Sequence, residues 1–95
     1  MAVIEICTFA VAADDDHFRA ADARMQTEFA YRQPGLYRRT TARGADRRWC
    51  VITLWREEGD ADRAAANAET DAVGRAFWSL VDADSVDVQR FTMLE

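Results

Sequence analysis

Hydrophobic residues in the segment 47–56 (Arg-Arg-Trp-Cys-Val-Ile-Thr-Leu-Trp-Arg) follow a strand pattern that is apolar on both sides. Valine, isoleucine, threonine and tryptophan favour the pleated, packed surface of a sheet. One alternating side carries Trp49, Val51, Thr53 and Trp55, and the other carries Cys50, Ile52 and Leu54. A strand with one face in water would be polar at every second position. The segment therefore predicts a central strand that is covered on both faces.

Three further strands are predicted. Residues 2–11 are again apolar on both sides, with Ile4, Ile6 and Thr8 opposite Val3, Glu5, Cys7 and Phe9. Residues 36–42 are more polar, as expected for an edge strand, and residues 43–46 form the turn that leads into segment 47–56. Residues 86–94 alternate as a final strand.

Helical spacing of hydrophobic residues occurs in three segments. The segment 15–32 follows an acidic cluster that suits a helix N-terminus, and Gln33-Pro34-Gly35 ends it. The alanine-rich segment 61–69 is predicted to be a helix with Asp60 as its N-cap. A short helix after Asp71 carries an apolar stripe formed by Val73, Ala76, Phe77, Leu80 and Val81, with Trp78 off that stripe.

The element order β-α-β-β-α-α-β predicts an α+β, ferredoxin-like domain over residues 1–95. Right-handed crossovers give an antiparallel sheet of strand order 4-1-3-2, with one layer of helices. We expect the helices to cover the side of Ile4, Ile6, Ile52 and Leu54. The other face would carry Glu5, Cys7, Phe9, Val51, Thr53 and Trp55, with Phe91 and Met93 beside them. This face is too apolar for water, so a second subunit is expected to cover it.

Composition restricts the class of partner. Three Trp, two Tyr and five Phe are many for 95 residues, which favours self-association or a ligand cavity. The net charge of −5 argues against nucleic acid or an anionic membrane as the main partner. No signal peptide is evident, and Cys7 and Cys50 are predicted on opposite faces of the sheet, without a disulfide. A reduced cytoplasmic protein is expected.

Four stretches resemble a known family: Ile4-Glu5-Ile6-Cys7-Thr8-Phe9, Arg32-Gln33-Pro34-Gly35-Leu36, Val51-Ile52-Thr53-Leu54-Trp55, and Ala76-Phe77 with Leu80-Val81-Asp82. Together they are similar to the dimeric α+β barrel superfamily, and within it to the small antibiotic-biosynthesis-monooxygenase-like proteins. The resemblance implies a homodimer with a pocket between the sheet and the helices of each subunit. Its members include cofactor-independent oxygenases of aromatic polyketides and haem-degrading enzymes.

Haem degradation is not expected for this chain. In the haem-degrading members the resemblance assigns roles to an asparagine, a tryptophan and a histidine. The asparagine position corresponds here to Cys7, no tryptophan occurs in segment 61–68, and no histidine follows His17. We therefore predict neither a metal site nor a cofactor.

Glu5 is the candidate catalytic residue, because it is an acid within an otherwise apolar alternation. It would act as a general base on a substrate proton. The alternative, which the sequence favours, is a salt bridge to Arg38, Arg39 or Arg90. Cys7 would need a lowered pKa to be reactive, so simple packing is its favoured role.

Aromatic side chains are the candidate walls of a ligand pocket. Trp55 and Trp78 would line a pocket mouth or, equally, a dimer interface. The remaining predicted pocket residues are Cys7, Phe9, Thr53, Phe77 and Phe91. Arg32, Arg38 and Arg39 would either hold a carboxylate or phenolate, or form a solvated edge.

Two classes of function follow from these residues. The first is a dimer that binds a small apolar or aromatic molecule and, if catalytic, oxygenates it without a cofactor. The second is a non-catalytic ligand-binding or stress-associated dimeric module. The sequence alone does not decide whether the protein is an enzyme.

Overall fold

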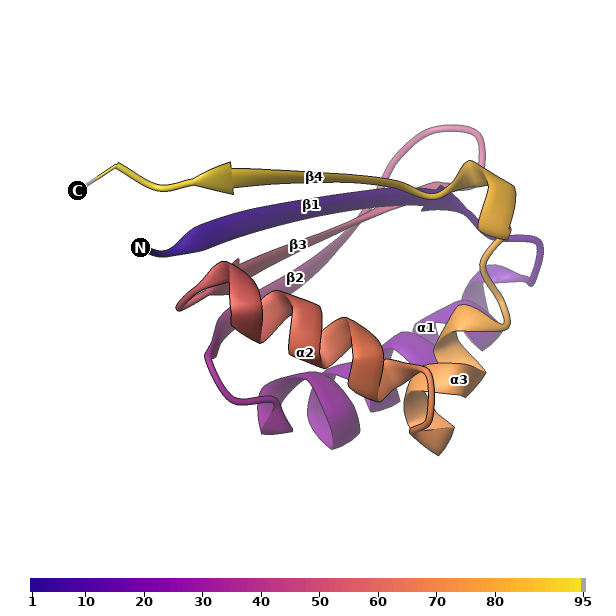
Figure 1. Cartoon of the computed structure of the whole chain (residues 1–95). Helices are drawn as coiled ribbons and strands as arrows, with labels where there is room; N and C mark the ends of the chain where they lie inside the picture. The colour runs from indigo at the N-terminus through magenta and orange to yellow at the C-terminus, as the bar shows by residue number, and fades with distance from the viewer. Residues whose placement is uncertain (95) are drawn as a thin grey trace.

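The structure, a computed structural model, describes residues 1–94. A four-stranded antiparallel sheet carries the helices as a layer on one face (Figure 1). The strands are β1 (Val3–Ala10), β2 (Leu36–Arg43), β3 (Arg48–Trp55) and β4 (Asp87–Thr92). The α-helices are α1 (Asp15–Arg24), α2 (Glu58–Ala68) and α3 (Ala72–Trp78). The predicted α+β, ferredoxin-like class is confirmed.

The sheet order is β2-β3-β1-β4, which is the predicted order counted from the opposite edge. β1 lies between β3 and β4, and β3 lies between β2 and β1. The two strands whose sequences are apolar on both sides are therefore the central ones. A central strand has no solvent-exposed edge that would require polar residues. Burial therefore places these two apolar strands in the centre of the sheet.

The predicted assignment of the two sheet faces is wrong. The helices cover the face of Cys7, Phe9, Val51, Thr53 and Trp55, which are all buried. Ile4, Ile6 and Leu54 are half-buried on the open face, and Ile52 is 39% exposed there. Both sides of these strands are apolar, so alternation alone could not decide which face of the sheet the helices cover. The helices cover the side with the larger aromatic rings, which removes more apolar area from water.

Three fully buried phenylalanines form the centre of the core. Phe9 of β1 contacts Phe18 of α1 and Phe77 of α3, each with ring centroids 6.0 Å apart and an edge-on geometry. Edge-to-face contacts place the positive ring edge on the negative face of the neighbour. The Phe9 cluster therefore fixes α1 and α3 against the sheet.

The predicted helix 15–32 is helical throughout but is not one regular α-helix. After α1 the chain continues as a π-helical segment (Met25–Phe29) and a 3-10 turn (Ala30–Arg32). Asp14 caps the start by accepting a hydrogen bond from the backbone of His17 at 2.9 Å. The wider π turn is common near functional sites, and here it places Met25 and Phe29 over the sheet.

α2 begins three residues before the predicted segment, and Asp60 is not its cap. Glu57 occupies the N-cap position, while Asp60 lies inside the helix and is buried. The carboxylate of Asp60 accepts hydrogen bonds from Arg56 at 2.9 and 3.0 Å, so it is engaged away from the helix terminus. Gly35, with φ +85°, packs directly against it.

The open face of the sheet is rich in hydrophobic residues. Phe91 of β4 pairs with Ile4 of β1 and is 50% exposed, and Met93 is also exposed. Phe91 therefore lies on the opposite face from Cys7 and Trp55, contrary to the prediction. Cys7 and Cys50 do lie on opposite faces, and both are free thiols. In residues 1–94, no helix has the length and apolar character needed to cross a membrane.

Candidate functional site

A cavity of about 90 Å³ lies between the helix layer and the sheet. Its bulky apolar walls are Met25, Phe29, Leu36, Trp55 and Trp78. Its small residues are Ala30, Ala61, Ala64, Ala65 and Ala68, and its polar residues are Glu5, Gln33, Arg39 and Thr53. An apolar space with a few convergent polar groups is the usual form of a small-molecule site.

The alanines of α2 explain why this space is open. Ala61, Ala64, Ala65 and Ala68 recur at helical spacing, so they lie on one face of α2. Each side chain ends at Cβ, and the helix therefore reaches the sheet without filling the volume in front of Trp55. The π-helical segment closes the opposite wall with Met25 and Phe29.

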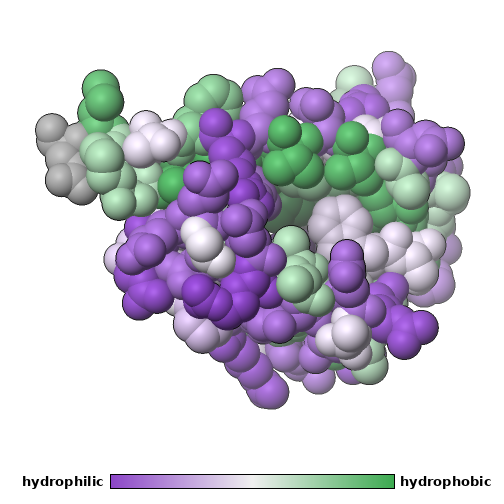
Figure 2. Space-filling view, in the orientation of Figure 1, coloured by the Kyte–Doolittle hydropathy of each residue, from purple (hydrophilic) through white to green (hydrophobic). Residues whose placement is uncertain are grey.

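The cavity continues into a larger surface groove of about 400 Å³. The two spaces share Ala65, Ala68 and Trp78, and the groove adds Glu69 and Arg75. Trp78 is 38% exposed, so its indole borders both the inner space and solvent. Figure 2 shows a hollow bordered by hydrophobic atoms between β4 and the helices α2 and α3. A molecule larger than the inner cavity can therefore extend outward.

Glu5 lines the cavity from β1 and is held by one arginine. Oε2 of Glu5 accepts a hydrogen bond from Nε of Arg90, its cross-strand neighbour on β4, at 2.7 Å. Nη1 of Arg90 donates to Asp62 of α2 at 2.6 Å. The hydrogen bond to Asp62, and then that to Glu5, raises the pKa of Arg90 above its ordinary value. Of the three arginines considered from sequence, Arg90 is thus the partner.

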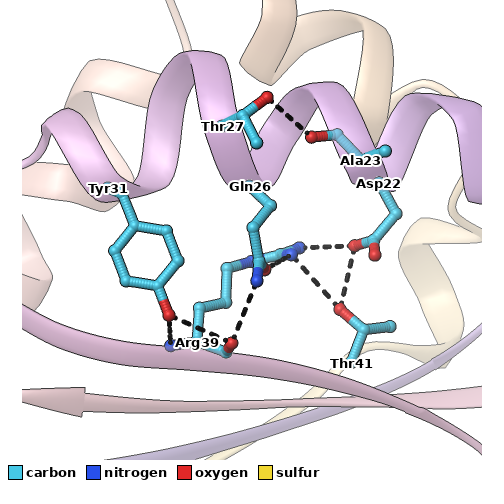
Figure 3. Close-up of polar contacts among 7 residues, drawn as sticks. All are labelled: Asp22, Ala23, Gln26, Thr27, Tyr31, Arg39 and Thr41. Carbon is cyan, nitrogen blue, oxygen red and sulfur yellow. Dashed lines mark hydrogen bonds and ion pairs between the residues drawn. The ribbon is translucent and has the colours of Figure 1, made fainter.

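Arg39 of β2 is the second charged residue of the cavity lining and is only 5% exposed. Figure 3 shows its guanidinium under α1 and the π-helical segment, between Gln26 and Asp22. Nη2 donates to Oδ1 of Asp22 at 2.8 Å. The main chain of Arg39 is also fixed, because its N–H donates to the hydroxyl of Tyr31 at 2.8 Å. Arg32 and Arg38 are exposed, so the predicted cluster separates into one buried and two solvated arginines.

Thr53 and Trp55 form one unit on β3. Nε1 of Trp55 donates to Oγ1 of Thr53 at 2.9 Å, and both residues are buried. A buried indole N–H without a partner would be unfavourable, so this bond fixes the tilt of the Trp55 ring. The ring is thereby held as a rigid wall.

The predicted site residues divide into three groups. Glu5, Thr53, Trp55 and Trp78 line the cavity together. Cys7, Phe9 and Phe77 are buried in the core beside it and do not line it. Phe91 lies on the other face of the sheet.

Cys7 has the environment of a packing residue. Burial, with a smaller contribution from the negative charge of Glu5, raises the pKa of the Cys7 thiol to about 11. At neutral pH the group is therefore a thiol, which is a poor nucleophile.

Sequence reasoning missed Met25, Phe29 and the alanine face as parts of the site. Met25 and Phe29 recur at helical spacing within the predicted helix 15–32, and an ordinary α-helix would place both in plain packing against the sheet. The periodic alanines of α2 were a usable signal, since a face of small residues opposite a tryptophan leaves unfilled volume.

Solved structures of the same fold cover almost the whole chain. SnoaB from Streptomyces nogalater, a cofactor-independent oxygenase, is 25% identical, with 99% of this chain and 94% of SnoaB covered and a TM-score of 0.80. A candidate antibiotic biosynthesis monooxygenase from Bordetella bronchiseptica is 15% identical, with coverage of 99% and 98% and a TM-score of 0.79. A dimeric ferredoxin-like protein of unknown function from Jannaschia is 11% identical, with coverage of 98% and 100% and a TM-score of 0.70.

These likenesses confirm the resemblance inferred from the sequence. The fold is that of the antibiotic-biosynthesis-monooxygenase-like proteins of the dimeric α+β barrel superfamily. No protein-family model matches the sequence, and no curated protein matches it significantly.

Proposed function

We propose that this protein is a homodimer that binds a small aromatic molecule in the cavity and oxygenates it with dioxygen, without a cofactor. The observation that carries the proposal is the cavity itself, an apolar space with indole walls from Trp55 and Trp78. Flat, apolar molecules stack on such walls. The likeness to SnoaB, which is a cofactor-independent oxygenase, supports the same class of reaction.

The proposed reaction converts an activated C–H₂ group of the substrate to a carbonyl. A base removes one proton, the resulting carbanion reacts with dioxygen, and one oxygen atom stays on carbon. The other oxygen leaves as water together with the two substrate hydrogens. Excluding bulk water from the site protects the carbanion from simple reprotonation.

Glu5 is the candidate base, because it is the carboxylate that lines the cavity. Arg90 holds Oε2 of Glu5, and none of residues 1–94 donates a hydrogen bond to Oε1. Oε1 is therefore the oxygen that would accept the substrate proton, while Arg90 keeps the carboxylate oriented.

The proposed dimer covers the open face of the sheet. The face carries Ile4, Ile6, Ile52, Leu54 and Phe91. A row of half-buried and exposed aliphatic and aromatic side chains on a sheet is unfavourable in water and suits a self-complementary interface. The similar protein from Jannaschia is dimeric, which supports this arrangement.

A non-catalytic ligand-binding or stress-associated module is the second candidate. The observation that favours it is the ion-pair cluster around Arg90, which joins β1, β4 and α2. Glu5 would then serve only to hold these elements together. This role requires a cavity but no reaction.

Oxygen uptake with a panel of polycyclic phenols and anthrones separates the two candidates. The oxygenase is expected to consume one dioxygen per carbonyl formed, and Glu5→Gln should bind the same compound but consume no oxygen. Ala64→Phe fills the cavity and should abolish both binding and uptake. Binding without uptake by any compound would favour the non-catalytic module, and binding that Ala64→Phe leaves unchanged would contradict the cavity as the site.

A further inference from the structure

Arg39 is the one residue of the cavity lining that is both cationic and buried, among residues 1–94. A guanidinium presents five N–H donors and no acceptor. Burying such a group is unfavourable unless its donors find partners. The partners of each Arg39 nitrogen therefore show how much of its donor capacity the fold itself uses.

The fold uses only part of that capacity. Nη1 donates to Oε1 of Gln26 at 2.9 Å and to Oγ1 of Thr41 at 3.2 Å, and Nη2 donates once, to Asp22. Within residues 1–94, Nε–H donates to no acceptor. No side-chain nitrogen or oxygen that is sealed from solvent in this part of the chain lacks a partner. The Nε–H group of Arg39 is therefore not sealed from solvent, although the residue as a whole is buried. Arg39 lies between two spaces, the cavity and a surface groove of about 660 Å³ that Asp22, Gln26 and Thr41 also line. The Nε–H edge, opposite these three partners, is the edge left for the cavity.

The unused donors lie on one edge of the guanidinium. The hydroxyl of Thr41, which accepts from Nη1, itself donates to Oδ1 of Asp22 at 2.9 Å. Thr41 and Asp22 thus sit together at the Nη1–Nη2 end (Figure 3). The opposite edge, Nε–H with the second hydrogen of Nη2, is a two-donor fork of the kind that binds a carboxylate or phenolate oxygen.

The surrounding charges permit an anion at this fork. Glu5 is the other charged residue of the cavity lining, and its Oε2 is already paired with Arg90 at 2.7 Å. Asp22 contacts the far end of the guanidinium, where it fixes the orientation of Arg39. Because Asp22 balances the charge of Arg39, selectivity must come from the directed donors more than from net charge.

We propose that the cavity selects aromatic oxyanions, with Arg39 binding the phenolate or carboxylate oxygen and Trp55 contacting the ring. The inference rests on the proposed function only in that the same cavity binds a ligand, and it does not require a reaction. The inner volume holds about one ring beside the oxyanion, and further rings extend past Trp78 into the adjoining groove.

Two probes with the same ring system test the proposal: 2-naphthoate and the neutral 2-naphthalenemethanol. Calorimetry on the full chain is expected to show naphthoate binding at least about tenfold tighter, the effect of a hydrogen bond to a charged group. The double variant Arg39→Gln with Asp22→Asn removes both charges of the pair. Its affinity for naphthoate should be at least about tenfold weaker. The affinity of the double variant for the alcohol should change by less than about twofold. The control variant Arg38→Gln, at an exposed neighbouring residue, should bind both probes as the unchanged protein does.

Arg39→Lys provides a second test should the double variant fail to fold. Lysine keeps the ion pair with Asp22 but has no fork, so naphthoate should bind several-fold more weakly while the alcohol is unaffected. A purely structural Arg39 would instead change both affinities together. Equal binding of the two probes, or an unchanged preference in the variants, would overturn the role of Arg39 and leave the cavity proposal standing. Failure of both probes to bind at millimolar concentration would overturn the two proposals together.

Discussion

Nε of Arg90 lies 2.7 Å from Oε2 of Glu5, directly across the β1–β4 ladder. The same guanidinium reaches Asp62 and Glu58 of α2 at 2.6 and 3.5 Å. One side chain on an edge strand therefore forms ion pairs with three carboxylates and joins α2 to the sheet, beside the cavity. Glu5 retains its place in the cavity lining because its charge is balanced there.

Arg90→Met should lower the free energy of unfolding by about 1–2 kcal/mol, because it leaves Glu5 half-buried without its cation. Urea denaturation followed by tryptophan fluorescence measures the change. Arg24→Met is the matched control, since Arg24 at the end of α1 pairs with Glu28 of the π-helical segment, and both side chains are exposed. The control should leave the urea midpoint unchanged. Equal effects of the two substitutions would show that the Arg90 cluster is an ordinary surface pair.

Gly35→Ala should destabilise the fold by more than about 2 kcal/mol. Gly35 has φ +85°, which an alanine adopts only with strain, and an added Cβ would overlap the buried carboxylate of Asp60. Gly59→Ala is the comparison, because a Cβ there meets no atom within 4 Å and the residue lies in α2. Thermal unfolding should show Gly59→Ala at or above the stability of the unchanged protein, by up to about 1 kcal/mol. If Gly35→Ala left the stability unchanged, the result would contradict the close packing of Asp60 beneath the Gln33-Pro34-Gly35 turn.

Alkaline pH should destabilise the protein through Cys7. The folded pKa of this thiol is about 11, above the ordinary 9.0, so the folded state holds the proton more tightly than the unfolded chain does. The resulting stability is fully present below pH 9 and is lost between about pH 9 and 11, by about 2–3 kcal/mol. All twelve basic residues are arginine, so no lysine titrates in this range. Denaturation at pH 8.0 and 10.5 should show that the free energy of unfolding falls less for Cys7→Ala than for the unchanged protein. An identical fall in the two proteins would place Cys7 in a more solvated environment.

Ile52→Arg should dissociate the proposed dimer without unfolding the subunit. Ile52 is 39% exposed on the open sheet face, so the arginine would be solvated in a monomer but buried and unpaired in a dimer. Sedimentation equilibrium is expected to give twice the mass of the chain for the unchanged protein and the mass of one chain for the variant. Thr27→Arg, on the exposed side of the π-helical segment, is the control and should remain dimeric. A monomeric unchanged protein at micromolar concentration would remove the dimer from the account.

The order of the strands was predictable because it depends on a pattern that the sequence states clearly. Two strands are apolar on both sides, and only central strands are buried in that way. The same property concealed which face the helices cover. With Ile4 and Ile52 on one side and Phe9 and Trp55 on the other, alternation supports either assignment. The difference in ring size decides it, and that difference is a matter of three-dimensional packing.

The partner of Glu5 illustrates a second limit. Three arginines were chemically suitable, and the choice among them depends on the register between β1 and β4. Those strands are the first and the last of the chain, so no tight turn sets their register. The sequence grouped Arg39 with Arg32 and Arg38, and only the structure shows that Arg39 is buried while the other two are exposed.

The indole N–H signals of the three tryptophans test the central claim, that the cavity binds an aromatic ligand, most directly. Trp55 and Trp78 line the cavity, while Trp49 packs in the core against Phe18, with ring centroids 4.6 Å apart. In ¹⁵N-labelled protein titrated with 2-naphthoate, the signals of Trp55 and Trp78 are predicted to shift together and saturate, while that of Trp49 stays in place. Saturable shifts confined to Trp49, or to the backbone amides of Ile52 and Phe91 on the open face, would contradict the cavity as the binding site.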